Sequence, residues 1–147
     1  RNVLLVKSEN PVSLEAIKAE TLPDAKLGTT DGVDWLLMNM PGDADYKGMD
    51  YAIAIATQGN LKAVSLVTSF DIKEGDVLQE ALRLAKETLE EKEKKLIATH
   101  EQGWNKYWSK SGVKLDDKVL QRWWYRQLYF AQASYLCPKL NRHSQFF

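Results

Sequence analysis

Few residues of the types that most often carry out chemistry occur in this sequence. His100 lies four residues after Leu96 and four before Trp104, and no second His, Cys or carboxylate shares the spacing that a site would need. We interpret His100 as a packed, hydrogen-bonded core residue, with a catalytic or metal-binding role as the alternative. His143 lies in an irregular tail, where we expect it to be solvated. The single cysteine, Cys137, excludes an internal disulfide and a thiolate zinc site.

The hydroxyl and carboxylate groups of the sequence form no recognisable catalytic or calcium-binding motif. Thr68-Ser69 could suggest a nucleophile, but no Gly-x-Ser-x-Gly elbow surrounds the pair, and we assign Asp71 to the start of a helix. Asp43 and Asp45 alternate without the remaining ligands of a calcium loop, so we predict a polar turn there. The sequence therefore predicts no catalytic residue, no cofactor and no metal site on this chain.

Aromatic residues form the one concentrated group, because nine of the fifteen lie between Trp104 and Tyr135. Aromatic rings can stack on sugars, but at helical spacing they more often fill a core, and both interpretations stay open here. Trp123 and Trp124 are adjacent and cannot share one helix face. That adjacency predicts a multi-helix or interdomain setting. The residues in question are Trp104, Tyr107, Trp108, Trp123, Trp124, Tyr125 and Tyr129.

The elements that position these residues differ between the two halves of the chain. In the first half, short apolar or alternating runs separated by Gly, Pro and Asp turns predict the antiparallel strands of a β-sandwich. Four or five strands would leave sheet edges exposed, so we expect further strands upstream. The predicted strands cover residues 2–7, 12–17, 33–40, 51–57 and 62–70.

The second half reads as helices, so the predicted fold class is α+β. An apolar stripe predicts one long helix over residues 76–108, begun by Asp76 and with Thr99 or Gly103 as the sites of any bend. Its middle, residues 86–95, holds eight charged residues in ten, with Glu90/Lys94 and Glu91/Lys95 as favourable pairs, and should act as a connector. Asp116-Asp117 should begin a second helix over 119–136, apolar nearly all round and therefore buried among other helices.

Composition narrows the class of protein. Twenty basic and twenty acidic residues cancel, which argues against a dedicated nucleic-acid binder, and no apolar run approaches the ~20 residues of a membrane span. Residues 1–73 carry a net charge of −3 and residues 74–147 a net charge of +3. The chain begins at Arg1 without an initiator Met or a signal-peptide pattern, so we expect a piece of a longer polypeptide.

A resemblance to a known family rests on the order and spacing of several short motifs. They are Val67-Thr68-Ser69-Phe70, the run from His100 to Ser111 (HEQGWNKYWSKS), Val113-Lys114-Leu115, and the run from Trp124 to Tyr129 (WYRQLY). Together they resemble the junction of α-L-fucosidase-type glycoside hydrolases (family 95), where a β-sandwich is followed by a linker helix and an (α/α)6 barrel. The resemblance covers roughly residues 50–137. It implies a sandwich end over 1–70, a linker helix over 71–112, the first barrel helix over 113–137 and an irregular tail over 138–147.

The same resemblance implies a function for a parent protein rather than for this chain. Family members hydrolyse glycosidic bonds with inversion, using two groups ~6.5 to 9.5 Å apart. These groups lie downstream of the first barrel helix, so Asn141 receives no catalytic role. The implied substrate is an oligosaccharide or glycan, relatives are often secreted or periplasmic, and exposed strand or helix surfaces could support a homo-oligomer. Two alternatives remain: a non-catalytic protein- or glycan-interaction module, and a sugar phosphorylase of similar plan.

Overall fold

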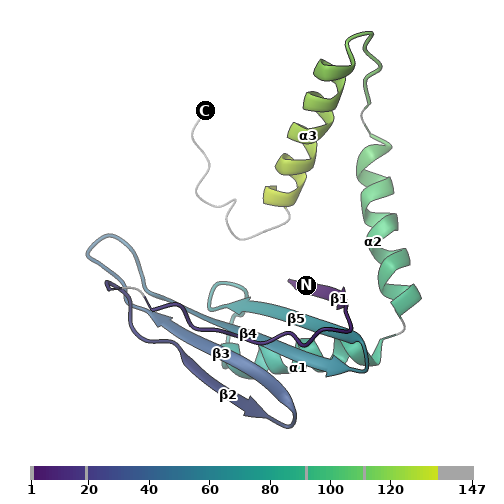
Figure 1. Ribbon diagram of the computed structural model, residues 1–147. Helices are drawn as coiled ribbons and strands as arrows, with labels where there is room; N and C mark the ends of the chain where they lie inside the picture. Colours follow the sequence, from purple (N-terminus) through teal and green to yellow (C-terminus); the bar gives the residue numbers. More distant parts are fainter. Residues whose placement is uncertain (1, 19, 92, 111, 136–147) are drawn as a thin grey trace. The chain divides into compact units, whose positions relative to one another are not determined.

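The computed structural model describes residues 2–18, 20–91, 93–110 and 112–135 (Figure 1). The chain divides into two compact units, the first running from Arg1 to Leu96 and the second from Ile97 to Phe147. The first unit is an α+β structure built on one antiparallel sheet, and the second is helical. The predicted fold class, α+β with antiparallel strands before helices, is confirmed at that level.

Five strands form the sheet of the first unit. In chain order they are β1 (Val3–Lys7), β2 (Lys26–Thr30), β3 (Val33–Met40), β4 (Met49–Gln58) and β5 (Leu61–Thr68). Their order across the sheet is β1-β5-β4-β3-β2, and every neighbouring pair is antiparallel. Four of the predicted strands are thereby confirmed. The β4–β5 hairpin turns at Gln58-Gly59-Asn60, where Gly59 has the positive φ (60°) that such a turn favours.

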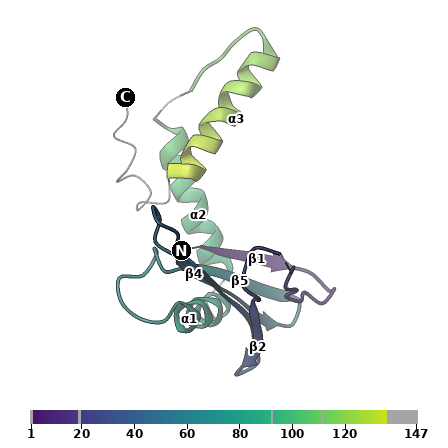
Figure 2. The same cartoon turned by 90° about the vertical axis from the view of Figure 1, so that its left-hand side faces the viewer.

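The predicted strand over residues 12–17 is wrong, because this segment is extended but joins no sheet. Val12, Leu14 and Ala16 are half-buried and alternate with exposed neighbours. The predicted alternation of side chains is therefore correct, whereas the predicted pairing with another strand is not. In Figures 1 and 2 this extended segment crosses the face of the sheet opposite helix α1 (Val77–Glu90). The described residues contain this single sheet, so a complete sandwich is not seen in them.

Strand β2 was not predicted from the sequence, because Lys-Leu-Gly-Thr-Thr is short and contains a glycine, which weakens a strand pattern. The structure supplies the reason for Gly28. A Cβ atom at that position would collide with the Trp35 ring on β3, so a glycine leaves room for the indole. The Trp35 Nε1 donates a hydrogen bond to Thr30 Oγ1 at 2.9 Å. Tertiary contact with a tryptophan therefore holds the edge strand in place.

Helix α1 packs on the sheet through small side chains. Its Ala81 and Ala85 are fully buried, as are Ala52 and Ala54 of β4, and small residues at a helix–sheet contact let the two backbones approach closely. Ser65 of β5 joins the layers, because its buried Oγ donates a hydrogen bond to the Ala81 carbonyl at 2.7 Å. The core of the first unit lies between α1 and the centre of the sheet.

The single long helix predicted over residues 76–108 is wrong, because two helices occupy this range. Helix α1 ends at Glu90, Glu91 has an extended backbone (φ −69°, ψ 141°), and α2 runs from Glu93 to Trp108. The break falls in the charged run rather than at Thr99 or Gly103. Ion pairs at i, i+4 contribute only about 0.2 to 0.5 kcal/mol each, which is little to hold a solvated stretch in helical form. The expected pairs Glu90/Lys94 and Glu91/Lys95 span this break.

The second unit is a helical hairpin of α2, from Ile97 onward, and α3 (Lys118–Tyr135). The predicted start of α3 is confirmed, because Asp117 Oδ1 accepts hydrogen bonds from the amides of Val119 and Leu120 at 2.8 and 3.1 Å. The predicted end at Leu136, like Cys137, Asn141 and His143, lies outside the described residues.

Candidate functional site

The rings of α2 and α3 form a continuous aromatic cluster within the second unit. Trp104 stacks on Tyr129 of α3 with ring centroids 5.2 Å apart and planes 16° apart. Trp104 also stacks on Trp108 at 5.8 Å, and Trp108 meets Tyr125 at 5.8 Å. Tyr107 lies edge-on to Trp104 at 6.0 Å. Apart from Trp123, the sequence-predicted aromatic group is therefore brought together in space. Two of its contacts, Trp104–Tyr129 and Trp108–Tyr125, join the two helices, and the others lie within one helix.

The polar ends of two tyrosines in this cluster are used in helix packing. Tyr107 Oη donates a hydrogen bond to the Leu128 carbonyl at 2.9 Å, and Tyr125 Oη donates to the Val113 carbonyl at 3.1 Å. Both bonds fasten one segment of the hairpin to another. Buried tyrosines usually place their hydroxyl groups in this way, so these contacts favour a structural role for the cluster.

The interpretation of His100 as a core residue is wrong. His100 is exposed, and its ring meets Trp104 edge-on with centroids 6.2 Å apart. Leu96 and Trp104 are half-buried, whereas Lys94 and Lys95 are exposed as expected, and Lys92 lies outside the described residues. The buried positions of this helical region lie on α1, whereas His100 belongs to α2, none of whose side chains is buried.

Trp123 and Trp124 occupy different environments, as their adjacency requires. Trp124 is half-buried and lies edge-on to Tyr125 at 4.9 Å, whereas Trp123 is 53% exposed. The guanidinium group of Arg126 lies 5.7 Å from the centroid of the Trp123 ring and 5.7 Å from that of Phe130. The sequence reading missed this exposed arginine–aromatic arrangement. The sequence does contain a pattern that could have predicted this arrangement. Arginines and rings are spaced three and four residues apart, and no Asp or Glu follows Asp117.

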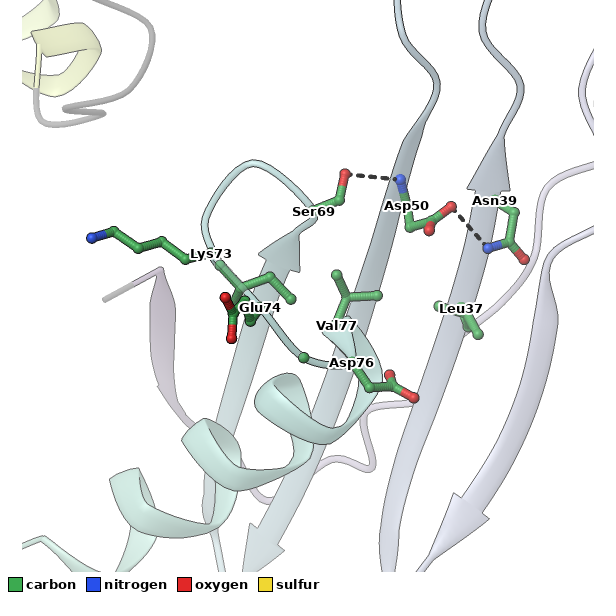
Figure 3. A pocket seen from close by; sticks show the side chains of 10 residues that line it. Leu37, Asn39, Asp50, Ser69, Lys73, Glu74, Asp76 and Val77 are labelled. Carbon is green, nitrogen blue, oxygen red and sulfur yellow. Dashed lines mark hydrogen bonds between the residues drawn. The ribbon is translucent and has the colours of Figure 1, made fainter.

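A cleft of about 410 Å³ lies in the first unit, between the ends of β3, β4 and β5 and the start of α1 (Figure 3). A chain of hydrogen bonds runs along it. Asn39 Nδ2 donates to Asp50 Oδ1 at 2.9 Å, and the Asp50 amide donates to Ser69 Oγ at 3.3 Å. The Ser69 amide donates in turn to the Asp50 carbonyl at 2.8 Å. Asn39, Asp50 and Ser69 thus bind one another across the strand ends.

Two further carboxylates near the cleft, those of Asp76 and Asp71, bind backbone amides. Asp76 begins α1, its side chain accepting from the amides of Leu78 at 2.7 Å and Gln79 at 3.4 Å. This confirms the predicted capping residue. Asp71 does not start the helix as expected. Its Oδ2 accepts from the amide and hydroxyl of Thr68 at 2.9 and 2.7 Å, which closes the turn after β5.

The loop between β3 and β4 is the polar turn that the sequence predicted. Asp43 Oδ1 accepts hydrogen bonds from the amides of Asp45 and Tyr46 at 3.0 and 2.8 Å. Across residues 2–18, 20–91, 93–110 and 112–135, no group of three or more His, Cys, Asp or Glu side chains is placed to hold a metal ion. None of the described helices is long and apolar enough to cross a membrane.

Comparison with models of known protein families found no match, and comparisons with curated protein sequences and with solved structures found none either. The assignment of function consequently depends on the residues and geometry described above.

Proposed function

We propose that this chain is the interdomain portion of a carbohydrate-active glycoside hydrolase of the α-L-fucosidase type, without catalytic groups of its own. In this proposal the sheet is part of the sandwich domain, α1 and α2 are the linker, and α3 is the first helix of the (α/α)6 barrel. The proposal is supported by the motifs that carry the resemblance, which include His100, Trp104, Trp108, Tyr125 and Tyr129.

The observation that carries the proposal is the aromatic packing of α2 on α3. The rings of Trp104, Trp108, Tyr125 and Tyr129 bring the two motif-bearing segments together, as a linker helix packed on a first barrel helix requires. The outer side of α3 keeps large apolar residues exposed, among them Leu120 at 59%. An apolar helix surface of this kind is suited to packing by further helices.

The test is the sequence of the gene on both sides of this segment, followed by expression of the full open reading frame. We expect further helices with inward-facing carboxylates downstream, and release of fucose from an aryl α-L-fucoside with inversion, followed by proton NMR of the first-formed anomer. The 147-residue chain serves as the control and should release no sugar above background. A reading frame that ends at Phe147, or fucose release by the short chain, would contradict the proposal.

The same assay separates the sugar phosphorylase alternative. A phosphorylase would form a sugar 1-phosphate and would require inorganic phosphate, whereas a hydrolase would release free sugar in its absence. Turnover that depends on phosphate would therefore replace hydrolysis with phosphorolysis as the function of the parent protein.

A non-catalytic interaction module is the second candidate, and the exposed Trp123 favours it. An indole with half of its surface in water can stack on a sugar ring. If the module binds glycans, Trp123→Ala should weaken binding of fucosylated oligosaccharides in a calorimetric titration with little change in melting temperature. Trp104→Ala, which removes a ring from the helix contact, is the matched comparison and should lower the melting temperature instead. Equal sugar binding by wild type and Trp123→Ala would exclude this ring as the binding platform.

A further inference from the structure

One side of α3 combines unpaired cations with exposed rings, and we call it the arginine–aromatic flank. It consists of Val119, Arg122, Trp123, Arg126 and Phe130, spaced so that they follow one side of the helix. Val119, Trp123 and Phe130 are 65%, 53% and 48% exposed. The contacts of α3 with α2 are made by a different set of positions, Tyr125, Leu128 and Tyr129. The flank is therefore free to contact something other than α2.

The charge of the flank is not compensated locally. Neither Arg122 nor Arg126 forms an ion pair within the part of the chain that the structure describes. Residues 118–135 contain three cations and no Asp or Glu, and the sequence from Lys118 to Phe147 contains five cations and no acidic residue. Arg83 of α1 is the contrast, because Glu80 and Glu87 bind its guanidinium group. A helix with this one-sided charge is complementary to a carboxylate-bearing surface.

The flank also has a place for an apolar side chain. A shallow hollow of about 250 Å³ is lined by Val119, Arg122, Trp123 and Arg126. Arg126 lies over the rings of Trp123 and Phe130, which holds its planar guanidinium group beside apolar surface. A ligand that fits must therefore present carboxylates next to a hydrophobic group.

We propose that the arginine–aromatic flank binds an acidic amphipathic helix of a protein partner. Arg122 and Arg126 are four residues apart, and carboxylates four residues apart on a partner helix would match that spacing. An apolar side chain between them enters the hollow, as in other complexes in which a helix lies against a hydrophobic surface. A neutral glycan would leave both arginines unpaired, and the zero net charge of the chain does not suit a nucleic-acid backbone. This inference uses only α3 and does not rest on the proposed hydrolase.

The experiment uses two synthetic peptides of roughly 18 residues, a length at which an isolated helix can form. The acidic peptide carries leucines on one side, flanked by Glu at i, i+4 spacing, and the matched peptide has Lys in place of each Glu. Binding of the fluorescently labelled peptides to the 147-residue chain is followed by anisotropy at low and at physiological salt. The test variant is Arg122→Glu/Arg126→Glu, and the control is Lys110→Glu/Lys114→Glu, which makes the same change of charge in the same unit.

We expect wild type and the control variant to bind the acidic peptide, and the test variant to bind it at least about 10-fold more weakly. The lysine peptide should bind the test variant more tightly than it binds wild type or the control variant. Far-UV circular dichroism checks that α3 is retained, and Arg122→Gln/Arg126→Gln replaces the charge reversal if that variant loses helix. Equal binding of the acidic peptide by wild type and the test variant would overturn the proposal. So would tighter binding of oligothymidylate or of phosphatidylserine vesicles than of the acidic peptide.

The flank could instead be occupied by a second copy of the chain, which a further measurement distinguishes from a partner helix. Sedimentation velocity of wild type and of Arg122→Glu/Arg126→Glu measures self-association directly. A monomer that binds the acidic peptide supports the proposal. A dimer that the arginine reversal abolishes, together with no peptide binding, would assign the flank to self-association and overturn it.

Discussion

Helices α1 and α3 meet their neighbours in opposite ways. Helix α1 presents the fully buried Ala81 and Ala85 to a sheet whose core residues are the alanines of β4 together with larger side chains such as Val33 and Val67. Its exposed Arg83 is bound by two glutamates. Helix α3 uses large rings for its contacts with α2 and keeps others, such as Trp123, in water. Both helices are amphipathic to different degrees, but only α1 has its apolar side covered.

This difference shows how the size of the contacting side chains affects how much of a helix's apolar surface is removed from water. Small residues bring two backbones together, so that α1 and the sheet exclude water between them without further partners. Rings hold backbones farther apart and offer surface on more than one side, so that α3 can contact α2 and still present the arginine–aromatic flank. The contact through small residues stabilises the first unit, whereas the contact through rings leaves other apolar side chains of α3 exposed.

The largest effect should come from truncating the covered apolar side of α1. Leu82 is 5% exposed in the core, so Leu82→Ala should lower the free energy of unfolding of the first unit by about 2 to 5 kcal/mol. Leu120→Ala on α3 is the matched control, and it should cost under about 0.5 kcal/mol because Leu120 is largely in water. Urea unfolding with hydrogen exchange followed by segment measures both. Similar losses for the two variants would show that α3 is covered as fully as α1.

A smaller loss is expected at the ring contacts of α3. Trp104→Ala removes the stacking on Tyr129 and Trp108 and should destabilise the second unit by about 2 kcal/mol. His100→Gln should change stability by less than about 0.5 kcal/mol, since this side chain is exposed. Hydrogen exchange of α2 and α3 is the measurement. A larger effect of His100→Gln than of Trp104→Ala would contradict the assignment of the helix contact to the rings.

Removing the N-cap carboxylate of α1 or of α3 should lower stability by similar amounts, and by less than the loss of a ring contact. Asp76→Ala and Asp117→Ala each leave two helical amides without their side-chain acceptor, at a cost of about 1 kcal/mol. The first loss should appear in the exchange of α1 and the second in that of α3. Asp76→Asn and Asp117→Asn keep an acceptor oxygen and serve as controls. If Asp117→Ala also raised exchange throughout the sheet, the two units would not unfold independently.

The smallest effect should be the dependence on pH of the charged side of α1. Hydrogen bonding and charge from Arg83 lower the pKa of Glu80 below its ordinary value of 4.5. A lowered pKa means that the stabilising contribution is complete above that ordinary value and is lost as pH falls through the folded pKa below it. Glu80→Gln should therefore flatten the acid side of the stability curve of the first unit. An unchanged curve between pH 5 and pH 2 would show that the pair contributes nothing measurable.

Local chemistry explains which parts of this fold could be predicted from the sequence. The caps Asp76 and Asp117, the Gly59 hairpin and four strands depend on short-range patterns, and all of them were predicted correctly. The helix break at Glu91 was not predicted, because the apolar stripe of the sequence continues across the charged run in which the break falls. Strand β2 depends on a tryptophan from its neighbour, a tertiary contact that no local pattern contains.

The candidate site shows the same limit. Six of the seven aromatic residues predicted as a group contact one another in the structure, because their helical spacing can be read from the sequence, whereas Trp123 lies apart from them. The exposure of His100 and of the arginine–aromatic flank could not be predicted in this way, since helical spacing does not state which side of a helix is covered. The lack of ion pairs at Arg122 and Arg126 could have been predicted, because the sequence has no Asp or Glu after Asp117.

The packing of Trp35 on Gly28 has a spectroscopic consequence. Four of the five tryptophans belong to the second unit, and Trp35 is the remaining one, on β3 of the sheet. A chain labelled with 5-fluorotryptophan should therefore give five fluorine resonances, of which a single one monitors the first unit. Because a methyl group at position 28 would collide with that indole, Gly28→Ala should move this resonance and leave the other four in place. The resonance of this one fluorine atom would then report the detachment of edge strand β2 from β3 in real time.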